Sequence, residues 1–227
     1  MLAMSASICA SAYDFSAKNS DGVFIYYNII SEEEKTCEVT AIEMRTYTSS
    51  DTIKDYVGDL KIPSSAIGYQ VTCIGNNAFH SCKELTSVTI PNSVTCIKDY
   101  AFYDCHGLTF IDLGNSINSI GRLAFGRCGN LSSISIPNSV KSIDEGAFYF
   151  CVKLKSLSIP NSVTSIGSSA FYFCVGLVSI SLPNSISVLE RGVFDRCKSL
   201  QTITIPNSVT KIGEGAFFLC ENLTSSL

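Results

Sequence analysis

The stretch from Leu131 to Lys153 reads LSSISIPNSVKSIDEGAFYFCVK, and the chain restates its pattern every 23 residues. The copies begin at Leu85, Leu108, Leu131, Leu154, Leu177 and Leu200, and another start follows at Leu223. Each copy carries a phenylalanine and then a cysteine at fixed places: Phe79, Phe102, Phe125, Phe148, Phe171, Phe194 and Phe217, followed by Cys82, Cys105, Cys128, Cys151, Cys174, Cys197 and Cys220. A fixed period in the twenties predicts a solenoid of stacked coils.

The first half of the repeat predicts two extended pieces. Leu131, Ile134 and Ile136 place aliphatic side chains on one side of a short strand. Pro137 ends this strand because it has no amide donor, and a second extended piece runs from Val140 to Ile143. Stacking the first pieces of successive coils predicts a parallel sheet on one face.

The second half of the repeat, Glu145 to Cys151, carries Ala147, Phe148 and Cys151 inward, most simply as one helical or 3₁₀ turn. The predicted fold class is therefore an α/β repeat solenoid. A repeat array of this kind also predicts a binding surface rather than a catalytic site, because each repeat packs only on its neighbours and the repeats do not enclose a single active-site pocket.

The repeats divide the chain into parts. Residues 13–59 read as an N-terminal β cap, with a hairpin over 21–43 in which DGVFIYYNII and TCEVTAIEM flank a charged turn. Residues 60–227 form the solenoid: a leading variant repeat at 60–84, six regular repeats at 85–222 and a partial repeat at 223–227. The leading repeat contains five extra residues around 66–70, which we expect to protrude as a loop where the cap meets the array.

The two ends of the chain carry their own expectations. Residues 1–12, MLAMSASICASA, are small and apolar and end in an A-x-A-like cleavage pattern, which favours a truncated signal peptide over a disordered N-terminus. Leu223 to Leu227 begins another strand without a polar cap. We therefore expect either a longer native array or a covering segment over Leu200 to Leu227.

Composition excludes several classes of function. Hydrophobic residues make up 46% of the 227 residues, charged residues only 16%, and the net charge is −4. The chain has no cluster of lysine and arginine of the kind that neutralises phosphates, so we expect no nucleic-acid partner. No apolar run approaches the length of a membrane-spanning helix.

The eleven cysteines read mainly as core residues. Seven follow the repeat period among apolar neighbours, where a free thiol behaves as a small hydrophobe, so we expect a spine of buried thiols. Cys73 and Cys96 share a different repeat position, filled later by Ser119 and Ser142. We favour two free thiols there, with a disulfide as the alternative; Cys9 and Cys37 have no evident partner.

Reactive constellations are not evident in the sequence. His80 and His106 stand at variable positions without the spaced partners of a metal site, which favours surface histidines. Asp144, Glu145, Glu190 and Glu214 fall before the Ala-Phe pair of their repeats, where we expect a charged outer rim. The sequence shows no nucleophile-elbow motif and no Cys-His pairing that can be distinguished from residues that simply recur with the repeat. We therefore predict no catalytic, cofactor or metal site.

The outward positions of the first strand are the candidate ligand-facing residues. They are Ser87, Thr89, Phe110, Asp112, Ser133, Ser135, Ser156, Ser158, Ser179, Ser181, Thr202 and Thr204. One interpretation is that small residues recur with the repeat and do nothing more. The other is a shallow face for an extended protein or glycan, with Phe110 and Asp112 as anchors.

The skeleton L-x-x-[VIL]-x-[IL]-P-x-S-[VI]-x-x-I-x-x-x-A-F-x-x-C resembles the Treponema/BspA-type leucine-rich repeat over residues 60–222. Copies such as LTSVTIPNSVTCIKDYAFYDC follow that pattern, and the N-terminal segment resembles the leader of such proteins in Bacteroides-like bacteria. Departures are Gly114 in place of proline and Val193 in place of alanine. The family has no catalytic residues to transfer to this chain.

The resemblance implies a non-enzymatic, secreted or cell-surface bacterial protein that binds protein partners in the manner of an adhesin, such as host matrix or bacterial surface proteins. Two alternatives stay open. The array could be a scaffold for an enzymatic or carbohydrate-binding domain beyond Leu227, or it could be a glycan-binding module that depends on Phe110 and Asp112.

Overall fold

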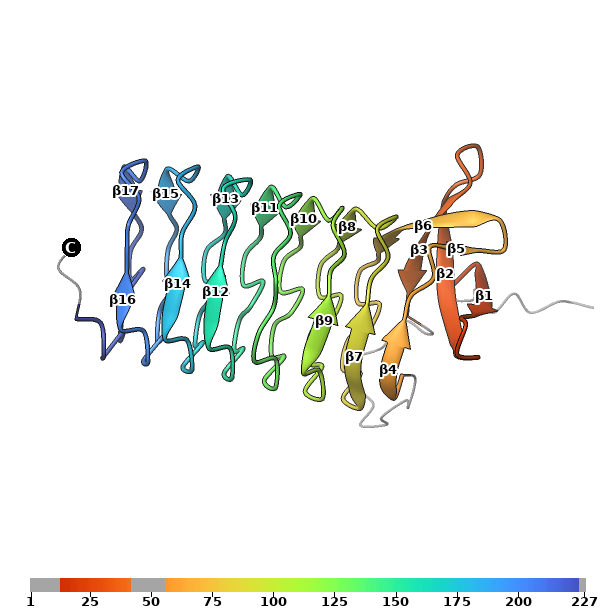
Figure 1. Ribbon diagram of the computed structural model, residues 1–227, viewed down its shortest axis with the longest axis horizontal. Helices are drawn as coiled ribbons and strands as arrows, with labels where there is room; N and C mark the ends of the chain where they lie inside the picture. Colours follow the sequence, from red (N-terminus) through yellow and green to blue (C-terminus); the bar gives the residue numbers. More distant parts are fainter. Residues whose placement is uncertain (1–12, 42–55, 225–227) are drawn as a thin grey trace, which may run out of the picture.

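A computed structural model describes residues 13–41 and 56–224. Figure 1 shows a single row of coils that extends from a group of antiparallel strands at the N-terminal end. The predicted solenoid of 23-residue coils with an N-terminal hairpin cap is confirmed. The predicted signal peptide at 1–12, Cys9 and the last residues of the partial repeat lie outside the described residues.

The first extended piece of the repeat forms parallel strands on one face. Alternation of buried and exposed side chains, as in Ser156–Ser158, is the pattern expected of strands with one face on the core. The strands form two separate sheets: β4 (Gly58–Lys61), β7 (Leu85–Thr89) and β9 (Phe110–Asp112) in one, and β12 (Ser156–Ser158), β14 (Ser179–Ser181) and β16 (Thr202–Ile203) in the other.

The second extended piece forms another parallel ladder along the upper edge of Figure 1. Its members are β6 (Tyr69–Ile74), β8 (Cys96–Ile97), β10 (Ser119–Ile120), β11 (Ser142–Ile143) and β13 (Ser165–Ile166), followed by the separate pair β15 (Val188–Leu189) and β17 (Lys211–Ile212). Residues 23 apart face each other throughout, as Ile120 and Ile143 do.

The predicted helical turn before each cysteine is wrong, because the described residues contain no helix. In the coil of Phe148, every second backbone amide donates to a carbonyl of the next coil: Phe148 donates to Ala170 (2.8 Å) and Phe150 to Tyr172 (2.8 Å). The amides between them donate within the coil to the carbonyl three residues earlier, as that of Tyr149 does to Gly146. Hydrogen bonds between coils thus replace the bonds within one segment that a helix needs.

Left-handed backbone makes this turn ladder possible. Two positions in each regular coil have positive φ, two residues before and two after the repeated phenylalanine. At the second position the residues are Ser81, Asp104, Arg127, Phe150, Phe173, Arg196 and Leu219, with φ between 55° and 62°. Side chains of this variety are rare in that conformation, so the contacts between coils compensate its cost.

The core runs along the whole array. The repeated phenylalanines stack on one another, with ring centroids 5.4 Å apart for Phe102 and Phe125 and 5.5 Å for Phe125 and Phe148. The leucines, isoleucines, alanines and cysteines of the repeat surround this column and are buried with it. Each coil therefore contributes one layer to a continuous core, as solenoids require.

The spine of buried thiols is confirmed. Each thiol from Cys105 onward donates to the carbonyl of a phenylalanine 26 residues earlier, as Cys128 does to Phe102 (3.1 Å). Cys37 is likewise free and buried. The thiols are thus hydrogen-bonded core residues, and burial raises their pKa values.

The same burial predicts a loss of stability in alkali. Burial raises the pKa of Cys174 from 9.0 to about 12, so the folded chain keeps a proton that the unfolded chain releases. Unfolding therefore becomes easier as the pH rises above 9, by about 1.4 kcal/mol per pH unit for this thiol. We expect Cys174→Ala to lessen the slope of unfolding free energy against pH by that amount between pH 9 and 11, measured in urea. Equal slopes for the two proteins would contradict the assignment.

The N-terminal strands close one end of the array. β1 (Phe15–Lys18), β2 (Phe24–Ser31) and β3 (Thr36–Thr40) pair in antiparallel order, and β3 then pairs with β6 in parallel. The predicted hairpin over 21–43 is β2 and β3, while β1 is an additional strand. Lys98 and Glu38 form an ion pair at 2.6 Å that links the cap to the array.

The five extra residues form a tight hairpin rather than a loose loop. β5 (Ser65–Ala66) pairs with the start of β6 in antiparallel order, and Ile67 and Gly68 make the turn with φ of 48° and 81°. Positive φ at both central residues matches the twist of the flanking strands. Ile67 is 66% exposed at the tip, so the insertion does protrude.

Cys73 and Cys96 form a disulfide, so our preference for two free thiols was wrong. They face each other in the parallel register of β6 and β8, with Cα atoms 4.8 Å apart. This separation lies within the range that disulfides span. The bond joins the first two coils next to the cap.

Candidate functional site: a polar groove on the strand face

The outward side chains of the first strands form an exposed face, as their alternation predicts. Eleven of the twelve candidate residues are exposed. Ser87 is half-buried because its hydroxyl donates to the carboxylate of Asp59 (2.6 Å), and this bond lowers the pKa of Asp59. Phe110 is 54% exposed, a large value for an aromatic side chain.

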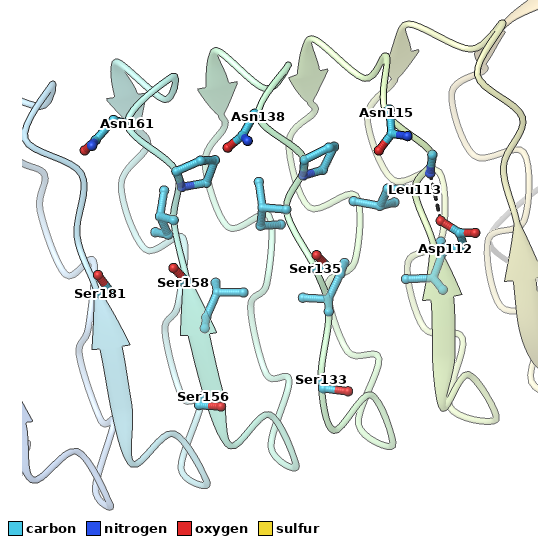
Figure 2. A pocket seen from close by; sticks show the side chains of 18 of the residues that line it. Asp112, Leu113, Asn115, Ser133, Ser135, Asn138, Ser156, Ser158, Asn161 and Ser181 are labelled. Atoms are coloured by element: carbon cyan, nitrogen blue, oxygen red, sulfur yellow. Dashed lines mark hydrogen bonds between the residues drawn. The ribbon is translucent and has the colours of Figure 1, made fainter.

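A groove of about 1070 Å³ crosses this face over four successive coils. Figure 2 shows its side chains in rows, with Ser133 and Ser156 in one, Ser135, Ser158 and Ser181 in the next, and asparagines in a third. Seven candidate residues line the groove: Phe110, Asp112, Ser133, Ser135, Ser156, Ser158 and Ser181. Ser87, Thr89, Ser179, Thr202 and Thr204 lie on the same face outside its lining.

The groove lies where the strand ladder is interrupted. Residues 133–135 occupy the strand position between β9 and β12 but form no ladder with either. At two other coils the pairing continues past the strand, since Ile90 donates to the carbonyl of Asp112 (2.9 Å) and Ile159 to that of Ser181 (3.0 Å), whereas Leu182 makes no such bond to Thr204 in the described part of the chain. The equivalent bonds from Leu113 and Ile136 are absent among the described residues.

Gly114 lies at the N-terminal side of the interruption. It stands where other copies have proline, and its φ of 61° turns the chain toward the preceding coil. A Cβ at this position would lie 2.8 Å from Asn92 Oδ1 and 2.9 Å from the carbonyl of Ile90, so a side chain would meet that coil. The Asp112 carboxylate holds the turn by accepting the amide of Gly114 (3.0 Å).

The asparagines at the rim were missed from the sequence, because only the proline of the Pro-Asn-Ser run was assigned a role. At two places the asparagine side chain accepts the backbone amide of the equivalent asparagine one coil later: Asn92 accepts from Asn115 (2.8 Å) and Asn161 from Asn184 (2.9 Å). Within the described residues, the side chains of Asn115, Asn138 and Asn184 accept no such bond, and all three line the groove. The strict 23-residue repetition of asparagine was the available signal.

Among the described residues, Asp112 is the only charged side chain that lines the groove. The rest of this lining is Phe110, serine hydroxyls, asparagine amides, prolines, backbone and the edges of aliphatic side chains, and it contains no described lysine, arginine or histidine. The groove therefore suits neutral or cationic ligands and disfavours acidic ones.

The ionisable groups named in the sequence lie elsewhere. Asp144, Glu145, Glu190 and Glu214 are exposed on the rim. His106 pairs with Asp104 at 2.8 Å, and the ring of His80 stacks on Tyr103. Within 13–41 and 56–224, no group of three or more His, Cys, Asp or Glu side chains could hold a metal ion, and no helix has the length and hydrophobicity to cross a membrane.

The model of the BspA-type leucine-rich repeat region matches residues 52–161 and 141–226, in six copies. The chain belongs to this family. Among solved structures, the leucine-rich repeat protein of Treponema pallidum shares 30% identity and a TM-score of 0.79, with 88% of each chain covered. No curated protein matches the sequence.

Two longer bacterial proteins are also similar to this leucine-rich repeat chain. A leucine-rich repeat protein from Bacteroides ovatus shares 33% identity with a TM-score of 0.80, over 93% of this chain and 52% of its own. A leucine-rich cell surface protein from Faecalibacterium prausnitzii shares 31% with a TM-score of 0.74, over 93% and 54%. The chain thus spans about half the length of these two relatives.

Proposed function

We propose that this leucine-rich repeat chain is a non-enzymatic, exported bacterial protein that binds other proteins through the groove on its strand face. The observation that carries the proposal is the groove itself, an open polar trough across four coils that is larger than a small-molecule pocket needs to be. Its lining offers many hydroxyl and amide partners but no paired acid and base. Affinity would come from numerous modest contacts along an extended partner.

Two observations support a location outside the cytosol. Cys73 and Cys96 form a disulfide, and disulfides form and persist mainly in oxidising surroundings outside the cytosol. The relative from Faecalibacterium prausnitzii is described as a cell surface protein. Together, this proposed location and the proposed protein-binding groove support an adhesin-like role at the bacterial surface.

A binding experiment with a matched control tests the proposal. Bacterial surface and extracellular-matrix proteins are captured on the immobilised chain, identified, purified and titrated individually. We expect Ser135→Arg/Ser158→Arg, which fills the groove, to weaken binding of a purified ligand by at least about tenfold. The control Thr95→Arg/Thr164→Arg adds the same charge at exposed positions outside the groove and should leave the affinity within about twofold.

The outcomes separate the proposal from its alternatives. Equal affinity of both double variants would show that the groove is not the binding surface. Absence of any purified protein ligand would favour a scaffold role. Saturable binding of a glycan that is lost in Phe110→Ala and Asp112→Ala would favour a carbohydrate-binding module.

A further inference from the structure

One coil of the array differs from the others at three places that face the groove. At the outward strand positions the regular coils carry serine or threonine, except for Phe110 and Asp112. The same coil replaces the repeated proline with Gly114. All three residues line the groove at its N-terminal end, next to the interrupted ladder. This coincidence singles out the end of the groove as its most specific part.

The carboxylate of Asp112 is available to a ligand. One of its oxygens accepts the amide of Gly114, and the side chain has no ion pair within the described residues. No cationic side chain of the part of the chain that the structure describes lines the groove to neutralise it. A ligand cation would therefore be the counter-ion, through a charge-assisted hydrogen bond.

Phe110 adds a preference for an organic cation. It lies two residues before Asp112 on β9, so both side chains project from the same face of the strand. An exposed aromatic ring beside a carboxylate suits a guanidinium or ammonium group with an alkyl stem, which contacts the ring face while its charge pairs with the carboxylate. A small hydrated metal ion would gain nothing from the ring.

The interrupted ladder leaves backbone groups beside the groove that suit a ligand with donors and acceptors of its own. The amide of Leu113 and the carbonyl of Ser135 lack the bond that pairs equivalent groups in neighbouring coils, as do the amide of Ile136 and the carbonyl of Ser158. An extended polypeptide that lies across the coils carries donors and acceptors of its own that can bind such groups and the serine and asparagine side chains beside them.

We propose that the groove binds an extended polypeptide segment carrying lysine or arginine, with the cationic group held between Phe110 and Asp112. This inference rests on the proposed function and specifies its ligand. The partner segment lies across the coils, and its basic residue fixes where along the groove it binds.

A selection of random twelve-residue peptides on the immobilised full chain tests this directly. We expect the bound peptides to be enriched in lysine and arginine. Replacing that residue with glutamine in a synthetic selected peptide should weaken binding by about tenfold, and Asp112→Asn should produce a similar loss together with a weaker dependence on salt. Phe110→Ala should weaken binding without changing the salt dependence.

Glu190→Gln is the matched control, because it removes the same charge from an exposed carboxylate outside the groove. It should leave peptide affinity unchanged. All three substituted side chains are exposed, so thermal melting of the variants should coincide with that of the parent chain and separate a binding defect from misfolding.

The outcomes distinguish failure of the basic anchor from failure of the proposed function. Peptides that bind without basic enrichment, or equally well to Asp112→Asn, would overturn the basic anchor and leave protein binding in place. Failure of the parent chain to bind any peptide or purified protein would overturn both. Binding of neutral oligosaccharides instead, lost in Phe110→Ala, would also overturn both and assign the groove to glycans.

Discussion

Replacing Phe125 with alanine is expected to lower the free energy of unfolding by about 3–5 kcal/mol. The Phe125 ring is fully buried and stacks between Phe102 and Phe148, with centroids 5.4 and 5.5 Å away. Truncation removes its buried apolar surface and leaves a cavity in the middle of the column. Backbone bonds hold the coils at a set spacing, so the neighbours cannot collapse into the gap.

Chemical denaturation of the parent chain and the variant measures this effect. The matched control is Phe110→Ala, the same truncation at a side chain that is 54% exposed, which should change stability by less than about 0.5 kcal/mol. Losses of equal size at the two positions would contradict a phenylalanine column as the source of stability. Because each coil contacts only its neighbours, the loss should appear first in hydrogen exchange of the coils that flank Phe125.

Removing the disulfide with Cys73→Ser/Cys96→Ser is expected to cost about 3 kcal/mol of stability. The two cysteines are 23 residues apart, and their bond closes one coil of the array against the next. In the unfolded chain the disulfide restricts the conformations of the segment between the two cysteines. Its removal restores this conformational entropy to the unfolded chain and so lowers the stability of the folded one. The bond also lies where β6 joins the N-terminal strands to the array, so the effect should reach the cap.

Reduction provides the control. A thiol reductant should lower the urea midpoint of the parent chain toward that of the double variant, and it should leave the double variant unchanged. The ladder cysteines are already free thiols and give no response of their own. If the reductant has no effect on the parent chain, the bond does not contribute to stability as described.

Much of the fold followed from the sequence because the repeat carries the same information many times. The spacing of Leu131, Ile134 and Ile136 predicted the strand, and the recurrence of phenylalanine and cysteine predicted a stacked core. A single segment with this pattern would be ambiguous, but a coil that recurs at a constant interval must stack on its copies to bury its apolar side.

The helical turn was predicted wrongly for a physical reason. Asp-Glu-Gly-Ala-Phe has the composition of a short helix when the segment is considered alone. In the array its alternate amides bind carbonyls of the next coil, as Phe148 does with Ala170, and this pairing requires left-handed residues such as Phe150. The local helical preference of the segment is thus outweighed by hydrogen bonds that form only between coils.

By itself the sequence determined the period, the side chains that face the core and the hydroxyl-rich outward positions, since all of these are properties of one coil that recurs. The tertiary structure alone decided that Cys73 and Cys96 are joined, that the ladder opens at residues 133–135, and that Asp112 and the asparagine rim border one groove. These features depend on how adjacent coils are placed against each other. The repeat pattern of a single coil carries no information on that placement.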